Sequence, residues 1–457
     1  MGGLTAKRTS IIATISFMLS AWHNPAARAF NTDLLMVLTA ASLPWSTSLV
    51  SIFSACWVLA AALTFDYGAL LKFLKRPACF LPVAFFALAA VGTSWSDAPW
   101  SVRLYYIGPA FKLLFIPALL FHFQHSKRGW WVFVAFLVSC MLLMAMSWLA
   151  LLEPGIALKQ DDPQRGIFVK NYIDQGQEFA LCALALAYPI HALLRERRIR
   201  PALLLLAIVL GLLVNMAFVI VSRTAMVTMP IMLAVFAVLH LRWRTSAMIL
   251  AAVVLLAGLS FAASSQLRTT LHSFVRDYEL YKERNTPTSI GLRLEYWQKS
   301  LRFIQEAPLA GHGTGSTRGL YENARTGAGA AASAQAISNP HNQTLAVAIQ
   351  WGAIGVILLY AMWLSHLLLF RGEGFVAWVG LLVVVQNVLS SLFNSHLFDF
   401  HAGWMYVVGV GVAGGMALGA RSHGGSPDPW RWHAPSRCGI SGLAASKPTS
   451  DPPTAEA

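Results

Sequence analysis

Three residues of this chain combine a reactive side chain with a place at the edge of an apolar stretch or in a long polar segment: Arg223, Arg293 and His341. A guanidinium is a planar group with several donors that suits phosphate and pyrophosphate. An imidazole with an ordinary pKa accepts a proton at neutral pH. These side-chain types therefore indicate anion binding and proton transfer.

Arg223 lies between Ser222 and Thr224, where two apolar stretches meet with almost no connector. An arginine at that depth is costly unless it faces a cavity, pairs with an anion or extends to the membrane surface. Binding of a phosphate or pyrophosphate is the functional interpretation of Arg223. Extension to the interface is the alternative, since the junction lies near the membrane surface.

Arg293 stands early in a predicted helix that continues to Gln305 and ends before Pro308 and a glycine-rich turn. Four apolar residues with helical spacing predict one buried face of this helix: Leu294, Trp297, Leu301 and Ile304. Arg293 would lie beside that face, either in a site or simply on a solvated surface. The glycine-rich turn has no Gly-Lys-Ser sequence after it, so we interpret it as a close-packed turn.

His341 follows Pro340 and precedes an apolar stretch, which predicts a position at the boundary between water and membrane. A histidine there accepts a proton at neutral pH. The chain has 13 histidines, so a structural role is the alternative. Three hydrogen-bonding neighbours favour function, because they could orient the imidazole or bind sugar hydroxyls: Asn339, Asn342 and Gln343.

Asp399 lies between His396 and His401, before the last apolar stretch. It could orient His341, contact substrate or cap a helix. Polar residues from Lys170 to Glu178 predict that the sixth apolar stretch lines a wet cavity. No group of residues has metal-ligand spacing, so we expect no metal.

The elements that position these residues follow from the composition. Of 457 residues, 56% are hydrophobic and 12% are charged. Such a chain is a polytopic helical membrane protein, not a water-soluble globule. The net charge of +14 is explained by basic cytoplasmic loops, so we do not expect nucleic-acid binding.

Apolar stretches long enough to cross a bilayer predict about twelve transmembrane helices. We expect nine of them in residues 1–265, a large loop in 266–341, three more in 342–420, and a disordered cytoplasmic tail in 421–457. Lys and Arg gather in alternate connectors, which places both termini in the cytoplasm and the large loop outside. In a bacterium this means the inner membrane, with the loop and the active site facing the periplasm.

Four motifs occur in order along the chain: Ser222 to Thr224, Gly291 to Trp297, Pro308 to Gly315, and His341 to Leu345. Together, in this order and topology, they resemble the O-antigen ligase and polymerase superfamily. The resemblance extends over most of the chain. It implies an all-α, polytopic membrane glycosyltransferase of the GT-C-like type that is independent of metal and of any cofactor.

The resemblance also implies roles for individual residues. Arg223 and Arg293 would bind the diphosphate of an undecaprenyl diphosphate-linked O-antigen, and His341 would be the catalytic base. Asp399 resembles a further acidic position of ligases near the last span. Together with Asn342, whose side chain could bind sugar hydroxyls, it is expected to contribute to substrate binding. Charge on the departing diphosphate would be neutralised by the two arginines, and one direct displacement would invert the anomeric carbon.

The function that the resemblance implies is that of an O-antigen ligase, which transfers the O-antigen to lipid A–core oligosaccharide during lipopolysaccharide biosynthesis. An O-antigen polymerase would use a second polyprenyl-linked repeat as acceptor. A protein O-oligosaccharyltransferase would be expected to have a further outer domain. A transporter of lipid-linked glycans is the alternative from another class, although such proteins usually show internal repeats.

Overall fold

The computed structural model describes residues 24–158, 166–326, 331–335 and 337–422. Within these ranges the regular structure is helical and there is no strand, which confirms the all-α prediction. The predicted disordered tail lies, from residue 423 on, outside the described residues. The helices of the first half are α2 (Pro25–Ser42), α3 (Thr47–Ala62), α4 (Tyr67–Phe73), α5 (Pro77–Val91), α6 (Trp100–Phe111), α7 (Phe115–Phe123), α8 (Gly129–Leu152), α9 (Tyr172–Ala185), α10 (Ala187–Arg195) and α11 (Ile199–Phe218).

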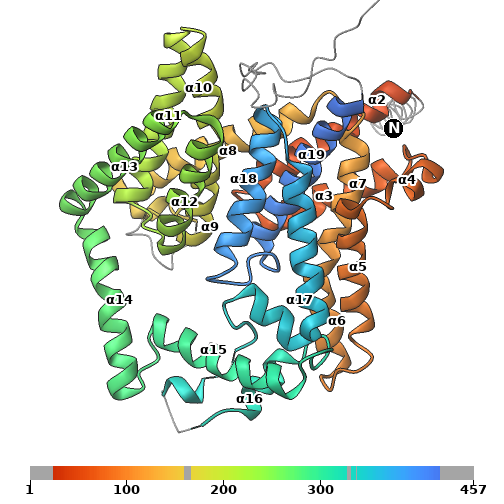
Figure 1. Ribbon diagram of the computed structural model, residues 1–457, viewed down its shortest axis with the longest axis vertical. Helices are drawn as coiled ribbons and strands as arrows, with labels where there is room; N and C mark the ends of the chain where they lie inside the picture. Colours follow the sequence, from red (N-terminus) through yellow and green to blue (C-terminus); the bar gives the residue numbers. More distant parts are fainter. Residues whose placement is uncertain (1–23, 159–165, 327–330, 336, 423–457) are drawn as a thin grey trace, which may run out of the picture.

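The second half continues with α12 (Arg223–His240), α13 (Trp243–Ala263), α14 (Ser265–Arg284), α15 (Ser289–Glu306), α16 (Thr317–Asn323), α17 (Gln343–Leu369), α18 (Phe375–Ser390) and α19 (Phe400–Ser422). Short 3₁₀ turns lie at Lys112–Leu114, Pro154–Ile156 and Ala332–Ala334. Figure 1 shows α14, α15 and α16 together at one end of the bundle. We call this end the loop end.

Seven helical stretches among the described residues are long and apolar enough to cross a membrane, or eight if the bent pair α3 and α4 is one span. This confirms a polytopic membrane protein. The number of full-length spans is below the predicted count of about twelve, which followed from apolar length alone. The difference arises partly because α5, α18 and the described part of α12 are apolar but shorter than a full span.

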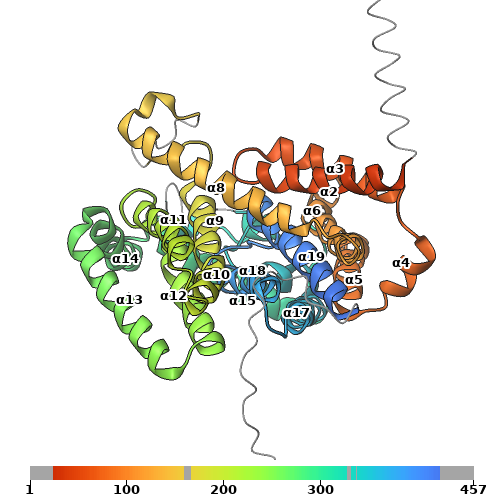
Figure 2. The same ribbon diagram turned by 90° about the horizontal axis from the view of Figure 1, so that it is seen from above.

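Helix α19 forms the centre of the bundle. It packs against α7 and α18, and Figure 2 shows it between the α2 and α3 pair and the more distant α13. Glycines allow this close packing, since a side chain at Gly411 would meet Leu119 and one at Gly409 would meet Val383. The apolar window of α19 is 83% buried, whereas that of α13 is 0% buried. Helix α13 is therefore exposed on the outside of the bundle, and α19 lies in its core.

The glycine-rich turn before α16 is inserted into a break in α17. At Gly352 the φ angle is +57°, and the helical hydrogen bonds stop. The turn replaces them: the His312 amide donates to the Ile349 carbonyl at 2.8 Å, and the Ala353 amide donates to the Pro308 carbonyl at 2.8 Å. A side chain at Gly352 would lie 2.3 Å from the Leu309 carbonyl oxygen. The turn is thus close-packed, as predicted, and completes the backbone of a helix.

Helix α15 exists where the sequence predicted it, but its predicted buried face is wrong. Leu301 is 55% exposed, whereas Tyr296, Ser300 and Phe303 are buried. The reason is a contact with α16, where the Ser300 hydroxyl lies 2.6 Å from the Tyr321 hydroxyl. Polar groups that hydrogen-bond to each other can be buried together, so the buried face of this helix is not its most apolar one.

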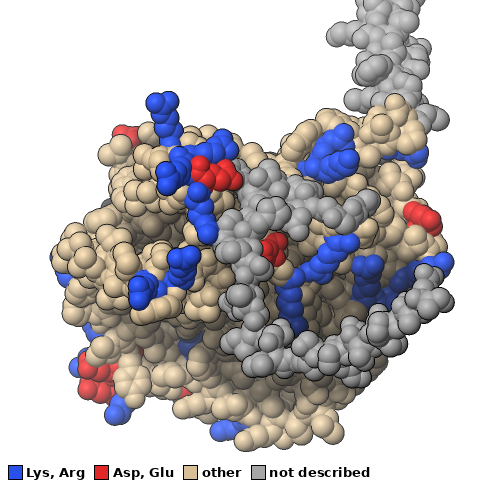
Figure 3. Space-filling view, turned by 45° about the horizontal axis from the view of Figure 1, so that its top comes forward, with Lys and Arg blue, Asp and Glu red and all other residues tan. Residues whose placement is uncertain are grey.

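Basic side chains gather at the end of the bundle opposite the loop end. Figure 3 looks partly onto this end and shows more Lys and Arg than Asp and Glu on it. The last residue of α10, Arg195, and the connector to α11 with Arg197 and Arg198 contribute to it. Arg421 donates from its guanidinium to the Leu369 carbonyl at 2.8 Å and so joins the end of α19 to that of α17. This end of the bundle is therefore basic.

A buried ion pair connects α9 to the end of α2. The Lys170 ammonium lies 2.7 Å from Glu178 Oε1, and the two side chains are 4% and 0% exposed. The ammonium also donates to the Leu43 carbonyl. Polar residues therefore do lie on the inner side of α9, where Asp174, Gln175 and Gln177 are buried as well.

Replacing Lys170 by Met should destabilise the protein by about 3–5 kcal/mol, because it leaves the Glu178 carboxylate buried without its partner. Thermal unfolding in detergent would measure the loss. The double variant Lys170→Met, Glu178→Gln should recover most of the stability, since it removes both charges. Equal unfolding temperatures for the wild type and the Lys170→Met variant would contradict a stabilising role for this pair.

Candidate active site

His341 lies at the loop end, in the turn that leads into α17. Opposite it is the connector between α18 and α19, residues 391–399. The two segments are joined through the backbone, since the Gln343 amide donates to the Ser391 carbonyl at 2.9 Å. His341 has a φ of +54°, a left-handed conformation that is uncommon for a residue with a side chain. Such backbone strain is concentrated at functional sites.

A chain of side-chain amides determines which nitrogen of His341 carries the proton. Asn339 Oδ1 accepts from the His341 backbone N–H at 2.9 Å and from the Ser395 hydroxyl at 2.7 Å. The other end of the Asn339 amide is therefore a donor, and it lies 3.1 Å from Asn394 Oδ1. Asn394 Oδ1 must then be an acceptor, and it lies 2.9 Å from His341 Nδ1. A backbone N–H cannot change its role, so the whole chain of assignments follows from it.

In this arrangement His341 Nδ1 donates to Asn394, which leaves Nε2 with a free lone pair. The structure gives no hydrogen bond to Nε2 from the residues it describes. Burial lowers the pKa of His341, and the positive charge of Arg293 lowers it further, whereas the hydrogen bond to Asn394 raises it. The imidazole is therefore neutral at pH 7, which is the form that accepts a proton.

Asp399 lies at the far end of the same chain. Asn394 donates from Nδ2 to Asp399 Oδ2 at 2.6 Å, so one amide connects the carboxyl group to the imidazole. Burial raises the pKa of Asp399 to about 7; Asp174 raises it as well, and Lys112 opposes the shift. Lys112 donates to the backbone carbonyls of Phe398 and Asp399. The connector is thus held in place from α6 and α7.

Arg293 lies on the first turns of α15, and its side chain is half-buried. Its charge contributes to the lowered pKa values of both His341 and His396. Burial is the main cause at His396, whose pKa is lowered to about 4. Helix α15 is held beside the turn by Trp297, whose indole donates to the Pro340 carbonyl at 3.2 Å. The structure therefore brings Arg293, His341 and Asp399 to one region.

Arg223 is the first residue of α12, with Ser222 as its N-cap. The side chain of Arg223 lies outside the described residues, so its proximity to His341 stays a prediction. The residue before it is described and lies close to α9, because a side chain at Gly176 of α9 would lie 2.7 Å from the Ser222 Cβ. The next residue, Gln177, lies with its Nε2 at 3.3 Å from His396 Nε2. The start of α12 therefore packs on the turn of α9 that reaches the connector.

Asn342 caps α17. Its side-chain oxygen accepts from the Leu345 amide at 3.1 Å, and its nitrogen donates to the Leu392 carbonyl at 3.3 Å. The carboxamide therefore holds the start of the helix against the connector. Binding of substrate by Asn342 stays a prediction.

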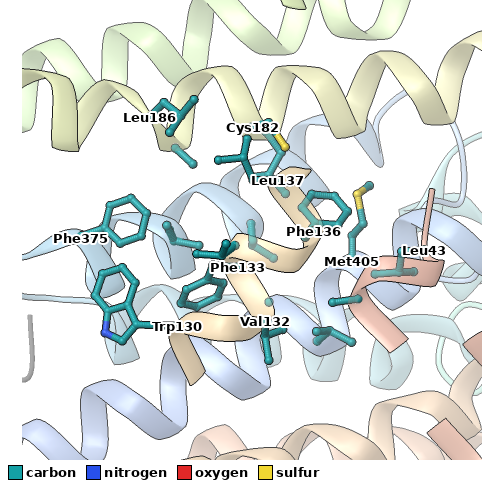
Figure 4. Close-up of a pocket in the computed structure, with 18 of the residues that line it drawn as sticks. Leu43, Trp130, Val132, Phe133, Phe136, Leu137, Cys182, Leu186, Phe375 and Met405 are labelled. Carbon is teal, nitrogen blue, oxygen red and sulfur yellow. The ribbon is translucent and has the colours of Figure 1, made fainter. Parts of the chain in front are cut away.

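A polar cavity of about 420 Å³ opens beside His341. Its wall is formed by α16 and by the segment that leads to the histidine. A second cavity, of about 250 Å³, lies among the helices and is lined by apolar residues from α2, α8, α9, α18 and α19. Figure 4 shows Phe133, Phe136, Phe375 and Met405 around it. The second cavity suits a hydrocarbon chain, whereas the first contains groups able to do chemistry.

Among the residues that the structure describes, no group of three or more His, Cys, Asp or Glu side chains is arranged to hold a metal ion.

Asn394 is the residue that sequence reasoning missed. It follows an apolar stretch, next to Ser395 and His396. A second run of hydrogen-bonding residues at the edge of an apolar stretch, similar to the one around His341, is the signal that could have identified it.

An all-α polytopic membrane protein with a polar site at one end of its bundle, built around a neutral histidine, is the class that this fold and site define. Within it, residues 208–360 match the family model described as O-antigen ligase. The matched stretch begins in α11 and ends in α17, so it contains Arg223, Arg293 and His341. This match supports the resemblance found from the motifs and indicates the O-antigen ligase and polymerase superfamily, whose members transfer glycosyl groups. No curated protein matches the chain.

Replacing Asn394 by Leu should lower kcat by about 10²-fold, since the imidazole loses the acceptor that fixes its tautomer. The KM for donor should change little. The assay is transfer of a lipid-linked glycan by the purified protein. Asn323→Leu, which replaces an exposed amide of α16, is the matched control. Wild-type kcat in the Asn394→Leu variant would exclude the orienting role.

Proposed function

We propose that this protein is an O-antigen ligase that transfers O-antigen polysaccharide from undecaprenyl diphosphate to lipid A–core oligosaccharide. The observation that carries the proposal is the free lone pair of His341 Nε2, which follows from the hydrogen bond of Nδ1 to Asn394. This nitrogen is on a residue that borders a polar cavity. The match of residues 208–360 to the O-antigen ligase family supplies the substrate class.

In the proposed reaction an acceptor sugar hydroxyl attacks the anomeric carbon of the donor glycan. The bond from the new oxygen to that carbon forms while the bond from the carbon to the diphosphate oxygen breaks. The electron pair of the broken bond leaves with undecaprenyl diphosphate, and the hydroxyl proton goes to His341 Nε2. A single displacement of this kind inverts the anomeric centre.

Arg293 and Arg223 are the proposed ligands of the diphosphate. The effect of Arg293 on the pKa of His341 supports its place beside the reacting groups. Support for Arg223 is indirect and comes from the packing of Ser222 on α9 next to Gln177. Two guanidiniums would stabilise the charge that develops on the leaving diphosphate without a metal ion. We assign Asp399 the task of holding Asn394 in the orientation that His341 needs.

The proposed location is the bacterial inner membrane, with the loop end in the periplasm and both termini in the cytoplasm. The basic end of the bundle supports this orientation, because Lys and Arg are retained on the cytoplasmic side. Residues 266–341 would then form a periplasmic cover, and the transmembrane helices would lie in residues 1–265 and 342–420. The apolar cavity of Figure 4 lies along α9, α18 and α19, and supports a bundle able to hold the lipid part of the donor.

The test combines purified protein with an undecaprenyl diphosphate-linked glycan and rough lipopolysaccharide. A ladder of extended lipopolysaccharide is expected, and its absence would overturn the assignment. If carrier-bound chains lengthen instead in the absence of lipid A–core, the protein is an O-antigen polymerase. Activity that is lost in a chelator and restored by magnesium would contradict the metal-independent mechanism.

A further inference from the structure

The polar cavity beside His341 has a composition that the transfer reaction alone does not explain. Two arginines and one glutamate of the α16 region line it, together with Ser338, Asn339 and His341. Ile337 is the one apolar lining residue among those that the structure describes. A cavity of this kind is suited to a hydrated, polar ligand and not to a hydrocarbon chain.

The charges of this cavity do not cancel. Arg318 lies 2.8 Å, measured from its Nε, from Glu322 Oε1, so this pair is internally compensated. The Arg325 side chain is exposed and, in the part of the chain that the structure describes, forms no hydrogen bond or ion pair, although its charge also contributes to the lowered pKa of Glu322, after the hydrogen bond from Arg318. One guanidinium is therefore in excess within the cavity. A guanidinium binds a phosphate or carboxylate through two parallel hydrogen bonds.

The position of the base decides which substrate occupies the cavity. A general base must reach the hydroxyl whose proton it removes, and in a transfer reaction that hydroxyl belongs to the acceptor. His341 forms part of this cavity's wall, whereas Arg293, the proposed diphosphate ligand, does not. The volume of about 420 Å³ lies within the range of small-molecule sites, which is roughly 300–1,000 Å³. It fits the end of an oligosaccharide and not a polymer.

We infer that this cavity is the acceptor subsite and that Arg325 binds an anionic substituent, a phosphate or a carboxylate, on the acceptor saccharide. The inference rests on the proposed function and deepens it. The segment that directly follows α16 thereby becomes an element of acceptor selection at the loop end, where Figure 1 shows α16. Ser338 lines the cavity and is a neutral hydrogen-bonding residue for sugar hydroxyls near the charged contact, whereas the amide of Asn339 is engaged with His341, Ser395 and Asn394.

The first experiment measures binding without any donor. The probe is a delipidated, phosphorylated and carboxylated core oligosaccharide, in three forms: untreated, phosphatase-treated and carboxyl-reduced. Wild-type protein should bind one of the treated forms at least about tenfold more weakly, because a hydrogen bond to a charged group is lost. The treatment that has this effect identifies the anionic group.

Arg325→Gln should bind the untreated oligosaccharide as weakly as the wild type binds the form without the anionic group. Arg325→Lys keeps the charge without the planar pair of donors. Its affinity for the untreated oligosaccharide should lie between those of the wild type and Arg325→Gln. Arg302→Gln, which removes an exposed arginine of α15, is the matched control and should bind as the wild type does. Unchanged thermal unfolding of each variant would show that folding is intact.

The inference is overturned if neither treatment weakens binding, or if Arg325→Gln binds like the wild type. It is also overturned if Arg325→Gln weakens binding of treated and untreated forms by the same factor, since the contact would then not be with the charge. In the transfer assay the variant should raise the KM for acceptor and leave that for donor unchanged. Because the binding assay contains no donor, failure of the wild type to transfer glycan would overturn the proposed function without altering the binding result.

Discussion

His341→Ala is expected to lower the rate of glycan transfer by about 10²–10⁴-fold, the usual contribution of a general base. The reason is the lone pair of Nε2, which the hydrogen bond from Nδ1 to Asn394 leaves available. Donor binding should remain close to that of the wild type, because the base acts on the acceptor hydroxyl. Single-turnover transfer and equilibrium binding of the lipid-linked donor measure the two effects separately.

The matched control for this substitution is His272→Ala, which removes an exposed histidine of α14 and should leave both quantities unchanged. Equal losses of transfer rate and donor affinity in His341→Ala would show that the histidine binds the donor and is not the base. A variant with undiminished transfer would exclude any catalytic role.

Arg293→Gln should lower kcat by about 10²–10³-fold, because a cationic donor that stabilises the leaving diphosphate is lost. The same substitution has a second, independent effect. The positive charge of Arg293 lowers the pKa of His341, so its removal raises that pKa. Transfer requires the neutral imidazole, and the acid limb of the kcat/KM profile should therefore move to higher pH.

The control for Arg293 is Arg302→Gln, which lies on the same helix with an exposed side chain and should shift neither kcat nor the pH profile. A reduced kcat with an unshifted acid limb would contradict the electrostatic effect of Arg293 on His341 and would leave only its proposed role at the diphosphate. Retention of full activity would exclude the diphosphate role.

The helices were predictable because apolar stretches of membrane length are a strong local signal. The lengths of the helices were less predictable: the sequence predicted α5 and α18 as spans, but they are shorter apolar helices, which pack against α17 and α19 respectively. The buried face of α15 could not be predicted from its own residues. It is set by Tyr321, whose hydroxyl hydrogen-bonds to the hydroxyl of Ser300, 21 residues earlier in the sequence.

The residues of the site also differ in how far the local sequence could predict them. His341 could be found because its neighbours in sequence are hydrogen-bonding residues, and Asp399 because it lies between two histidines. The residue that connects them, Asn394, is 53 positions from His341. No local sequence pattern predicts a hydrogen bond between an amide and an imidazole across that separation. The hydrogen bond between Asn394 and His341 depends on how α17 and α18 pack.

The glycine-rich turn, inserted at Gly352, attaches one side of the segment 266–341 to α17. Lifting the turn away from α17 would leave the Ile349 carbonyl and the Ala353 amide without partners, at a cost of roughly 1–3 kcal/mol for each group. We therefore expect the turn and the part of α17 that it contacts to stay together. Any movement that admits a bulky chain would then take place on the opposite side, where α14 follows the exposed helix α13.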